Sequence, residues 1–292
     1  MPRPILEQLA DGVVLGDGGY VYILKERGVP MGEWSAHSIM THPHEFVWLY
    51  QGFWAAGVDV LQAETFQTTR NRLARLGLAD RFEAINRRAV ELCRAIAGDE
   101  VLVAGSVGAA EGSRFLQATT REEVAQFYRE QCHLLKRLGV DFLICETLYW
   151  LDDALLALEA AKETGLPVIV TMTFRSPTSY DGFRPADCAK RLIAEGADVV
   201  GINCHFDPNQ MFPLIQQMRD AVDTFVAMQP VAVRNGLDGD IHWTQRQLSP
   251  NEMADYAVRA KEMGINYIGS CCGSSPDHVR AMAQALGKAP RA

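Results

Sequence analysis

Short apolar runs alternate with longer helical patterns along most of the chain. Most of the runs are continuous and rich in β-branched residues, which is typical of strands that are covered on both faces. Eight runs predict strands: Val13–Leu15, Val58–Leu61, Val101–Ala104, Phe142–Cys145, Val168–Val170, Val199–Ile202, Phe225–Ala227 and Tyr267–Ile268. Several of them follow a glycine of the kind that ends a helix in a left-handed conformation: Gly57, Gly139, Gly165, Gly196 and Gly264.

Helical patterns fill the segments between these runs. Pro43–Ala56 begins with proline in its first turn, where a helix tolerates it. Thr120–Leu138 opens with a candidate N-cap threonine followed by acidic residues. Ser249–Met263 opens with Ser-Pro-Asn-Glu, which places proline at the first helical position and glutamate at the third.

Repeated strand–helix units predict a single-domain α/β protein, a (β/α)8 TIM barrel that spans residues 1–292. A doubly wound open sheet is the alternative. The count of eight strands and the lack of a dinucleotide-binding fingerprint favour the barrel. Arg234–Gln247 is a long polar segment that contains Trp243, and long loops in compact domains are often functional.

Composition and charge exclude several classes of protein. The net charge is −8 and the charged residues are interspersed, so no basic stripe predicts a nucleic-acid partner. No apolar run reaches the roughly 20 residues of a membrane span, and the first residues lack the apolar stretch of a signal peptide. We therefore expect a cytoplasmic protein without a membrane partner. A homo-oligomer is compatible with the sequence.

The seven cysteines, an odd number in a large chain, argue against a disulfide framework. Adjacent Cys271 and Cys272 rarely pair with each other because the ring is strained. With Cys204 they could offer three thiolates to one metal, the number of protein ligands in a catalytic zinc site with an open position for a substrate thiol. Simple burial of small side chains is the alternative, and it is what we expect for the remaining cysteines: Cys93, Cys132, Cys145 and Cys188.

Functional residues of such barrels follow the carboxyl ends of the strands. The predicted strands are followed by polar or small residues: Asp17-Gly18-Gly19, Glu64-Thr65-Phe66-Gln67, Gly105–Gly108, Glu146-Thr147, Thr171 and Thr173, Asn203-Cys204-His205, Gln229-Pro230 and Cys271-Cys272-Gly273. Loops are polar in any protein, so this pattern supports a site at the carboxyl ends of the strands but does not establish which residues belong to it.

Two carboxylates and two glycines suggest a site for an amino acid. Asp17 and Glu146 could hold a substrate ammonium group, or they could cap neighbouring helices. Gly18 and Gly19 could present backbone N–H groups to a carboxylate, or they could form a tight turn. Trp34 could be a stacking wall for a cationic methyl donor or a cover at the surface.

At this point three motifs resemble a known family. Leu15–Gly19, Gly201–Pro208 and Gly269–Gly273 look like the motifs of the homocysteine S-methyltransferases, and Asn-Cys-His-Phe-Asp-Pro looks most like the betaine–homocysteine branch. The resemblance extends from about Leu6 to the last helix. It implies that Cys204, Cys271 and Cys272 are zinc ligands with a catalytic role.

The resemblance also assigns the substrate contacts. It implies that Asp17 and Glu146 hold the amino group of homocysteine, that Gly18 and Gly19 meet its carboxylate, that Trp34 is a wall of the betaine site, and that Asn203 neighbours the metal. Thr65, Phe66 and Gln67 are expected at the substrate as well. Gln67 and Thr147 depart from the pattern, because they stand where we expect tyrosines in the betaine enzymes, and an aromatic box binds quaternary ammonium through its ring faces.

Zinc-dependent transfer of a methyl group from an onium donor to the thiol of homocysteine, forming methionine, is the function that the resemblance implies. The partners are homocysteine and a small donor, with a betaine as first choice. The alternatives are a sulfonium such as S-methylmethionine or dimethylsulfoniopropionate, or a methylcobalamin donor, although no cobalamin-binding domain accompanies the barrel. A zinc protein that binds thiols without turnover and a zinc hydrolase are the rival classes; zinc hydrolases favour His and carboxylate ligands.

Overall fold

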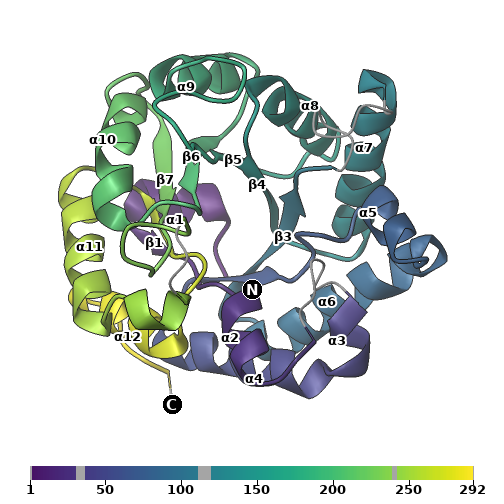
Figure 1. Ribbon diagram of the computed structural model, residues 1–292, viewed down its shortest axis with the longest axis horizontal. Helices are drawn as coiled ribbons and strands as arrows, with labels where there is room; N and C mark the ends of the chain where they lie inside the picture. Colours follow the sequence, from purple (N-terminus) through teal and green to yellow (C-terminus); the bar gives the residue numbers. More distant parts are fainter. Residues whose placement is uncertain (1, 31–36, 111–119, 239–241, 292) are drawn as a thin grey trace.

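The computed structural model describes residues 2–30, 37–110, 120–238 and 242–291. Its eight strands form one parallel sheet in the order β1-β8-β7-β6-β5-β4-β3-β2 (Figure 1). The strands are β1 (Val14–Leu15), β2 (Val60–Ala63), β3 (Leu102–Gly108), β4 (Phe142–Leu148), β5 (Val168–Met172), β6 (Val199–Asn203), β7 (Phe225–Gln229) and β8 (Tyr267–Ile268). The predicted TIM barrel is confirmed, and all eight predicted strands overlap strands of the structure.

The sheet curls into a ring that is nearly closed. β1 pairs with β8, with Val14 opposite Tyr267. Between β1 and β2 the regular ladder is missing, but the backbone N–H of Asp59 donates to the carbonyl of Leu15 at 2.8 Å. The carboxylate of Asp17 accepts the backbone N–H of Gln62 at 2.8 Å, so a side chain completes the seam.

The helices form an outer ring around the strands, apart from the first, whose Ile5 and Leu9 join the cluster inside the barrel (Figure 1). They are α1 (Ile5–Asp11), α2 (Val21–Glu26), α3 (Ser38–Thr41), α4 (Pro43–Ala56), α5 (Arg70–Arg75), α6 (Phe82–Ala97), α7 (Arg121–Arg137), α8 (Leu151–Lys162), α9 (Pro185–Ala194), α10 (Pro208–Arg219), α11 (Pro250–Glu262) and α12 (Pro276–Ala285), with short 3-10 turns η2 (Ala79–Arg81) and η3 (Trp243–Arg246). None of the described helices is long and apolar enough to cross a membrane.

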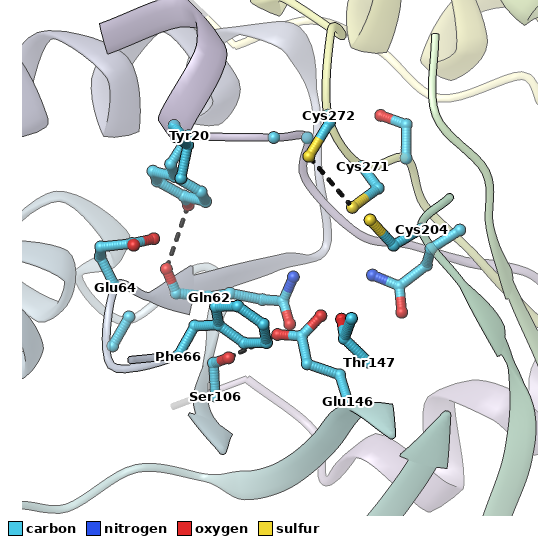
Figure 2. Close-up of a pocket in the computed structure, with 16 residues that line it drawn as sticks. Tyr20, Gln62, Glu64, Phe66, Ser106, Glu146, Thr147, Cys204, Cys271 and Cys272 are labelled. Atoms are coloured by element: carbon cyan, nitrogen blue, oxygen red, sulfur yellow. Dashed lines mark hydrogen bonds between the residues drawn. The ribbon is translucent and has the colours of Figure 1, made fainter. Parts of the chain in front are cut away.

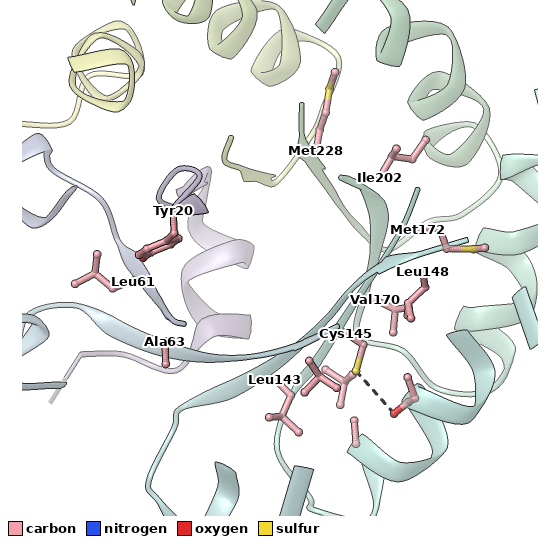
Figure 3. Packing of buried hydrophobic residues seen from close by; sticks show 14 of the residues in the cluster. Tyr20, Leu61, Ala63, Leu143, Cys145, Leu148, Val170, Met172, Ile202 and Met228 are labelled. Carbon is pink, nitrogen blue, oxygen red and sulfur yellow. Dashed lines mark hydrogen bonds between the residues drawn. The ribbon is translucent and has the colours of Figure 1, made fainter. Parts of the chain in front are cut away.

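The strands are buried on both faces because successive side chains point alternately into the barrel and toward the helices. Along β4, Leu143 and Cys145 join the core between sheet and helices, and Cys145 Sγ contacts the carbonyl of Ala157 in α8 at 3.8 Å (Figure 3). Phe142 and Ile144 point inward and belong to a separate cluster, to which α1 also contributes. Apolar side chains thus fill the lower part of the barrel.

Toward the carboxyl ends of the strands the inward positions become polar. In β4, the residue after Phe142 and Ile144 on the same face is Glu146. The equivalent change occurs on five other strands and gives the buried polar residues Gln62, Ser106, Thr171, Asn203 and Gln229. The barrel therefore has an apolar floor and a polar layer above it, and the candidate site is built on that layer.

Candidate active site

Three cysteines that are far apart in the sequence meet at the carboxyl end of the barrel. Cys204 follows β6, and Cys271 and Cys272 follow β8. Their sulfur atoms all lie within 4.8 Å of one another, and the Sγ atoms of Cys271 and Cys272 are 3.9 Å apart (Figure 2). The other four cysteines are buried elsewhere, as predicted. The sequence prediction that these three thiols converge is confirmed.

An unusual backbone presents Cys204 to this cluster. Cys204 and His205 have φ angles of 60° and 61°, in the left-handed region that residues with a Cβ rarely adopt. The backbone N–H of Cys204 donates to the carbonyl of Gln229 in β7 at 2.9 Å, which fixes the start of the turn. Asp207 then caps α10 by accepting the backbone N–H of Gln210 at 2.9 Å. A strained turn held at both ends is typical of functional sites.

Of the two predicted glycines, Gly19 lies directly against the cysteine pair and Gly18 packs against Ser274 and Phe53. A Cβ on Gly19 would stand 2.6 Å from the carbonyl oxygen of Cys271 and 2.8 Å from the Cα of Cys272. A Cβ on Gly18 would stand 2.9 Å from the ring of Phe53. The backbone N–H of Gly19 donates to Ser274 Oγ at 3.0 Å. The glycines therefore have a packing role that the sequence did not predict: they allow the β1 loop to touch the β8 loop.

The three thiols differ in their tendency to ionise. Hydrogen bonds from Cys271 and Cys272 hold the pKa of Cys204 well below its usual range. The pKa values of Cys271 and Cys272 are raised, because they donate to the Cys204 sulfur and because burial disfavours further charge. The cluster alone thus favours a single thiolate, and three thiolates together would need a cation.

A pocket of about 140 Å³ opens beside the sulfur atoms (Figure 2). The residues that line it are Gly18, Gly19, Tyr20, Val21, Gln62, Ala63, Glu64, Phe66, Ser106, Glu146, Thr147, Cys204, Gln229, Ser270, Cys271 and Cys272. None of these described lining residues is Lys, Arg or His, whereas two are glutamates. The pocket is therefore suited to cationic groups.

Glu146 is the predicted carboxylate that lines this pocket. One of its oxygens accepts the hydroxyl of Ser106, and the other accepts Asn203 Nδ2 at 3.2 Å. Asn203 also binds Thr147, donating to its Oγ1 at 2.7 Å and accepting its N–H at 2.8 Å. Burial raises the pKa of Glu146 to about 8. Asn203 immediately precedes Cys204, so one amide fixes the carboxylate and the strand that carries the thiol.

Asp17 has a different environment. It is fully buried and is not among the residues that line the pocket. Its carboxylate accepts the hydroxyl of Tyr20, the backbone N–H of Gln62 at 2.8 Å and Gln62 Nε2 at 3.3 Å. Burial raises the pKa of Asp17 to about 7. Here Asp17 lies behind Gln62 and Tyr20 and positions them, whereas the sequence predicted direct contact with an ammonium group.

Two amide oxygens lie buried at the pocket without hydrogen-bond partners. They are Oε1 of Gln62 and Oε1 of Gln229, and no described residue donates to either. A buried carbonyl oxygen without a donor is costly, so each is a candidate acceptor for a bound ligand. Both glutamines occupy inward positions of their strands, which the alternation along β2 and β7 could have indicated. The strand ranges predicted from apolar runs ended before these two residues, so the sequence analysis did not use that signal.

The remaining predicted residues divide between the pocket and its surroundings. Phe66 lines the pocket, whereas Thr65 is buried beneath it and donates to the carbonyl of Ser106 at 2.7 Å. Gln67 is not among the lining residues. Trp34 lies outside the described residues. The lining residues Tyr20 and Glu64 were not predicted as site residues, although Glu64 follows the second strand directly.

Two tyrosines near the cysteines, Tyr22 in α2 and Tyr149 after β4, each pack against a second aromatic side chain. Tyr22 lies 5.1 Å from Trp243, measured between ring centroids, and burial together with the nearby thiols raises the pKa of Tyr22 to about 12. Tyr149 stacks on Tyr180 at 5.3 Å, and burial and then Cys204 raise its pKa. Trp243 belongs to the long polar segment that the sequence suggested as functional.

The fold and the site together define a class, the (β/α)8 barrels that carry a three-cysteine centre at the carboxyl ends of the strands. The family profile described as homocysteine S-methyltransferase matches residues 14–286. The chain therefore belongs to the homocysteine S-methyltransferase family.

Individual relatives agree with this assignment. The chain is 33% identical over 306 residues to mouse betaine–homocysteine S-methyltransferase 1, covering 97% of this chain and 75% of the relative. It is 34% identical over 302 residues to mouse S-methylmethionine–homocysteine S-methyltransferase, covering 97% and 81%. The metallated crystal structure of the homocysteine methyltransferase MmuM from Escherichia coli has the same fold, with a TM-score of 0.78, 22% identity, and coverage of 96% of this chain and 99% of that one.

Proposed function

We propose that this protein transfers a methyl group from an onium donor to the thiol of homocysteine, with zinc held by Cys204, Cys271 and Cys272. The observation that carries this proposal is the three-sulfur cluster beside a pocket with carboxylate walls. The family membership and the names of the relatives support it.

The cysteine cluster suits zinc in both spacing and chemistry. Zinc–thiolate bonds of about 2.3 Å in a tetrahedral site place sulfur atoms roughly 3.8 Å apart. The 3.9 Å between Cys271 and Cys272, and the 4.8 Å limit for the whole set, are close to that spacing. Soft thiolate ligands favour zinc over magnesium or calcium. When bound, zinc would lower the pKa of a substrate thiol and keep it in the nucleophilic thiolate form.

The residues of the polar layer would orient the amino acid. Glu146, aligned by Ser106 and Asn203, can accept a substrate ammonium group by a charge-assisted hydrogen bond. Gln62, held by Asp17, offers its unpartnered Oε1 as a second acceptor. Because both acceptors are already held in place, little conformational entropy remains to be lost when the homocysteine thiol and the methyl donor come together.

The reaction balances without a redox cofactor. The bond between the methyl carbon and the donor nitrogen or sulfur breaks, and its electron pair stays on that heteroatom, which becomes neutral. A carbon–sulfur bond forms to the homocysteine thiolate, and the thiol proton passes to solvent. The contribution of the protein is alignment of the two reactants and exclusion of water.

A labelled-methyl assay tests this function. Zinc-loaded protein is incubated with homocysteine and with donors that carry labelled methyl groups, and methionine is analysed by mass spectrometry. We expect labelled methionine with at least one onium donor, and none with chelator-treated protein. Binding of homocysteine without labelled methionine from any donor would favour a thiol-binding protein without turnover, and hydrolysis of simple esters would favour a hydrolase.

A further inference from the structure

The loop between β7 and α11 carries none of the three cysteines, yet it lies between the two segments that do. Its described residues are 230–238 and 242–249, and we call it the β7 loop. In the ring, β7 separates β6 from β8. Figure 2 shows Cys204 reaching the pocket from one segment and the Cys271–Cys272 pair from another. The β7 loop is therefore placed to set the spacing between them.

The first part of the β7 loop holds the turn that carries Cys204. The backbone N–H of Leu237 donates to the carbonyl of His205 at 2.9 Å. Asp238 Oδ2 lies 3.1 Å from Nε2 of the same histidine. A Cβ on Gly236 would stand 2.6 Å from the carbonyl oxygen of His205, so the two backbones are in close contact. The left-handed turn at Cys204 and His205 is thus supported by the loop, as a strained turn requires.

Both ends of the β7 loop hold the segment that carries the cysteine pair. The backbone N–H of Ala232 donates to the carbonyl of Cys272 at 2.9 Å. From the other end of the loop, Gln247 Nε2 donates to the carbonyl of Gly273 at 2.6 Å. A Cβ on Gly273 would stand 2.6 Å from Cγ2 of Val233. One loop therefore binds both segments that supply sulfur atoms to the cluster.

A single side chain organises the β7 loop from within. Nη1 of Arg246 donates to three backbone carbonyls of the loop, those of Arg234, Gly236 and Asp238, at 3.1, 2.9 and 3.0 Å. The backbone N–H of Arg234 donates in return to the carbonyl of Arg246 at 2.7 Å. Carbonyl oxygens that converge on one point repel one another unless a donor, and best a cation, lies between them. The guanidinium group thus stabilises the shape in which the loop reaches both cysteine segments.

We propose that Arg246 is a positioning residue for the three-cysteine centre. By holding the β7 loop in this shape, it would keep Cys204 at the distance from Cys271 and Cys272 at which one metal ion binds all three sulfur atoms. Arg246 does not line the pocket, so it would act through the loop. This inference rests on the proposed function, because the group that it positions is the ligand set of the proposed zinc site.

The test compares Arg246→Leu with Arg246→Lys. Leucine removes the donor, so we expect zinc affinity to fall about 10- to 100-fold, as for other residues that support metal ligands. Competition with a chromogenic chelator measures this affinity. The three carbonyls meet at one nitrogen, so the ammonium group of lysine can take its place and should restore most of the affinity.

Cobalt substitution gives a readout that a loss of fold stability alone does not change. Cobalt(II) bound by three thiolates shows sulfur-to-metal charge-transfer bands and the intense d–d bands of a tetrahedral site. We expect these bands to weaken in Arg246→Leu and to return in Arg246→Lys. Unchanged zinc affinity and cobalt bands in Arg246→Leu, with only a lower unfolding temperature, would overturn the inference, and so would equal losses in the two variants.

A second variant tests the same loop if Arg246→Leu does not fold. Gln247→Ala removes one hydrogen bond to the segment after Cys272, so zinc affinity should fall about 2- to 10-fold, the range for a single hydrogen bond. Native affinity in Gln247→Ala would then count against the role of the loop. The matched control is Arg87→Leu, which removes an exposed guanidinium group in α6 and should leave the affinity unchanged.

Arsenite binding measures the spacing of the thiols without zinc. Arsenite forms three arsenic–sulfur bonds with three thiols and releases three water molecules. If the native protein binds no zinc but Arg246→Leu weakens arsenite binding about 10-fold or more, the proposed function fails and the positioning role stands. If labelled methionine forms and both proteins bind zinc and arsenite equally, the function stands and the role of Arg246 fails.

Discussion

At the scale of single residues, the site depends on a few side chains whose positions are fixed by others. Asn203 is an example: it is fully buried, and its amide binds both Glu146 and Thr147 while its backbone leads into Cys204. Asp17 holds Gln62 and Tyr20 in the same way. Groups that line the pocket are thus supported by buried polar partners, as precise sites require.

Cys272→Ser tests the metal centre directly. The substitution leaves two thiolate ligands, so we expect bound zinc to fall well below one ion per chain. We expect the rate of methionine formation to fall more than about 100-fold, because substitution of a residue that only supports a metal ligand can already cost that much. Metal analysis and the labelled-methyl assay measure the two effects. Cys188→Ala, at a buried cysteine outside the cluster, is the control and should keep its zinc.

Asp17→Asn tests the ionisation state of the Asp17 carboxyl group, which is buried where β1 meets β2. Because burial raises the pKa of Asp17 to about 7 from 3.8, the native state binds its proton more tightly than the unfolded state does. Its contribution to stability is therefore fully present below about pH 4 and is lost as pH rises through about 7, at about 1.4 kcal/mol for each unit of pKa difference. Asparagine cannot ionise, so the variant should lose less stability over this range.

Urea unfolding of chelator-treated protein at pH 5 and pH 7.5 measures this difference. The asparagine oxygen can still accept the backbone N–H of Gln62, which keeps the seam closed. Equal pH dependence in the native protein and the variant would mean that Asp17 stays ionised when buried, contrary to its surroundings.

At the scale of elements, the strands were easier to find than to delimit. The predicted range Phe142–Cys145 stops where apolar residues stop, whereas β4 continues through Glu146 and Thr147 to Leu148. β6 likewise continues through Asn203, and β7 through Gln229. Apolar patterns cannot reveal these ends, because the last inward positions carry the polar residues of the site.

The helices with clear end signals were predicted well. The range Pro43–Ala56 is identical to α4, and the range Ser249–Met263 corresponds to α11 with its two caps. Local hydrogen bonds decide such boundaries, and Ser249 does form a capping box with Glu252. The contact between Gly19 and the cysteine loop joins opposite ends of the chain, and no local pattern contains that information.

Gly19→Ala should disturb the loop after β8 without removing a ligand. The added Cβ would overlap the backbone of Cys271 and Cys272, which are part of the three-cysteine cluster. We expect zinc affinity to fall about 10- to 100-fold, as for other residues that support a metal site. Competition with a chromogenic chelator measures the affinity.

Gly28→Asn is the matched control for that variant. Gly28 has a φ of 82°, which asparagine tolerates better than most residues, and a Cβ there meets nothing within 4 Å. Zinc affinity should be unchanged in this control. Native affinity in Gly19→Ala would show that the two loops can separate without moving the sulfur atoms.

At the scale of the whole molecule, the three-cysteine cluster links strands that are not neighbours in the ring. β6 and β8 are separated by β7, and the cysteines after them meet above it. The sequence predicted this meeting because the carboxyl ends of all strands in a barrel lie on one face. The closure of the ring by Asp17 was not predictable, since it depends on a side chain replacing a ladder hydrogen bond.

Zinc removal should therefore destabilise the entire barrel. A ligand that binds only the native state adds about 2.7 kcal/mol at 100 times its Kd, so chelator should lower the thermal unfolding temperature by several degrees. Differential scanning calorimetry with and without chelator measures the change. Cys204→Ser should unfold at the same temperature in both conditions; a chelator effect that persists in this variant would place the stabilising metal elsewhere.

The separation of the three thiols along the chain also orders events during translation. Cys204 leaves the ribosome before Cys271 and Cys272, so the nascent chain offers this site only one of its thiols until β8 has been made. One thiolate does not form a tetrahedral zinc site. If zinc binds here as proposed, its set of thiolates is complete only once the segment after β8 has joined the segment after β6, so metal binding would report that these two parts of the barrel have come together.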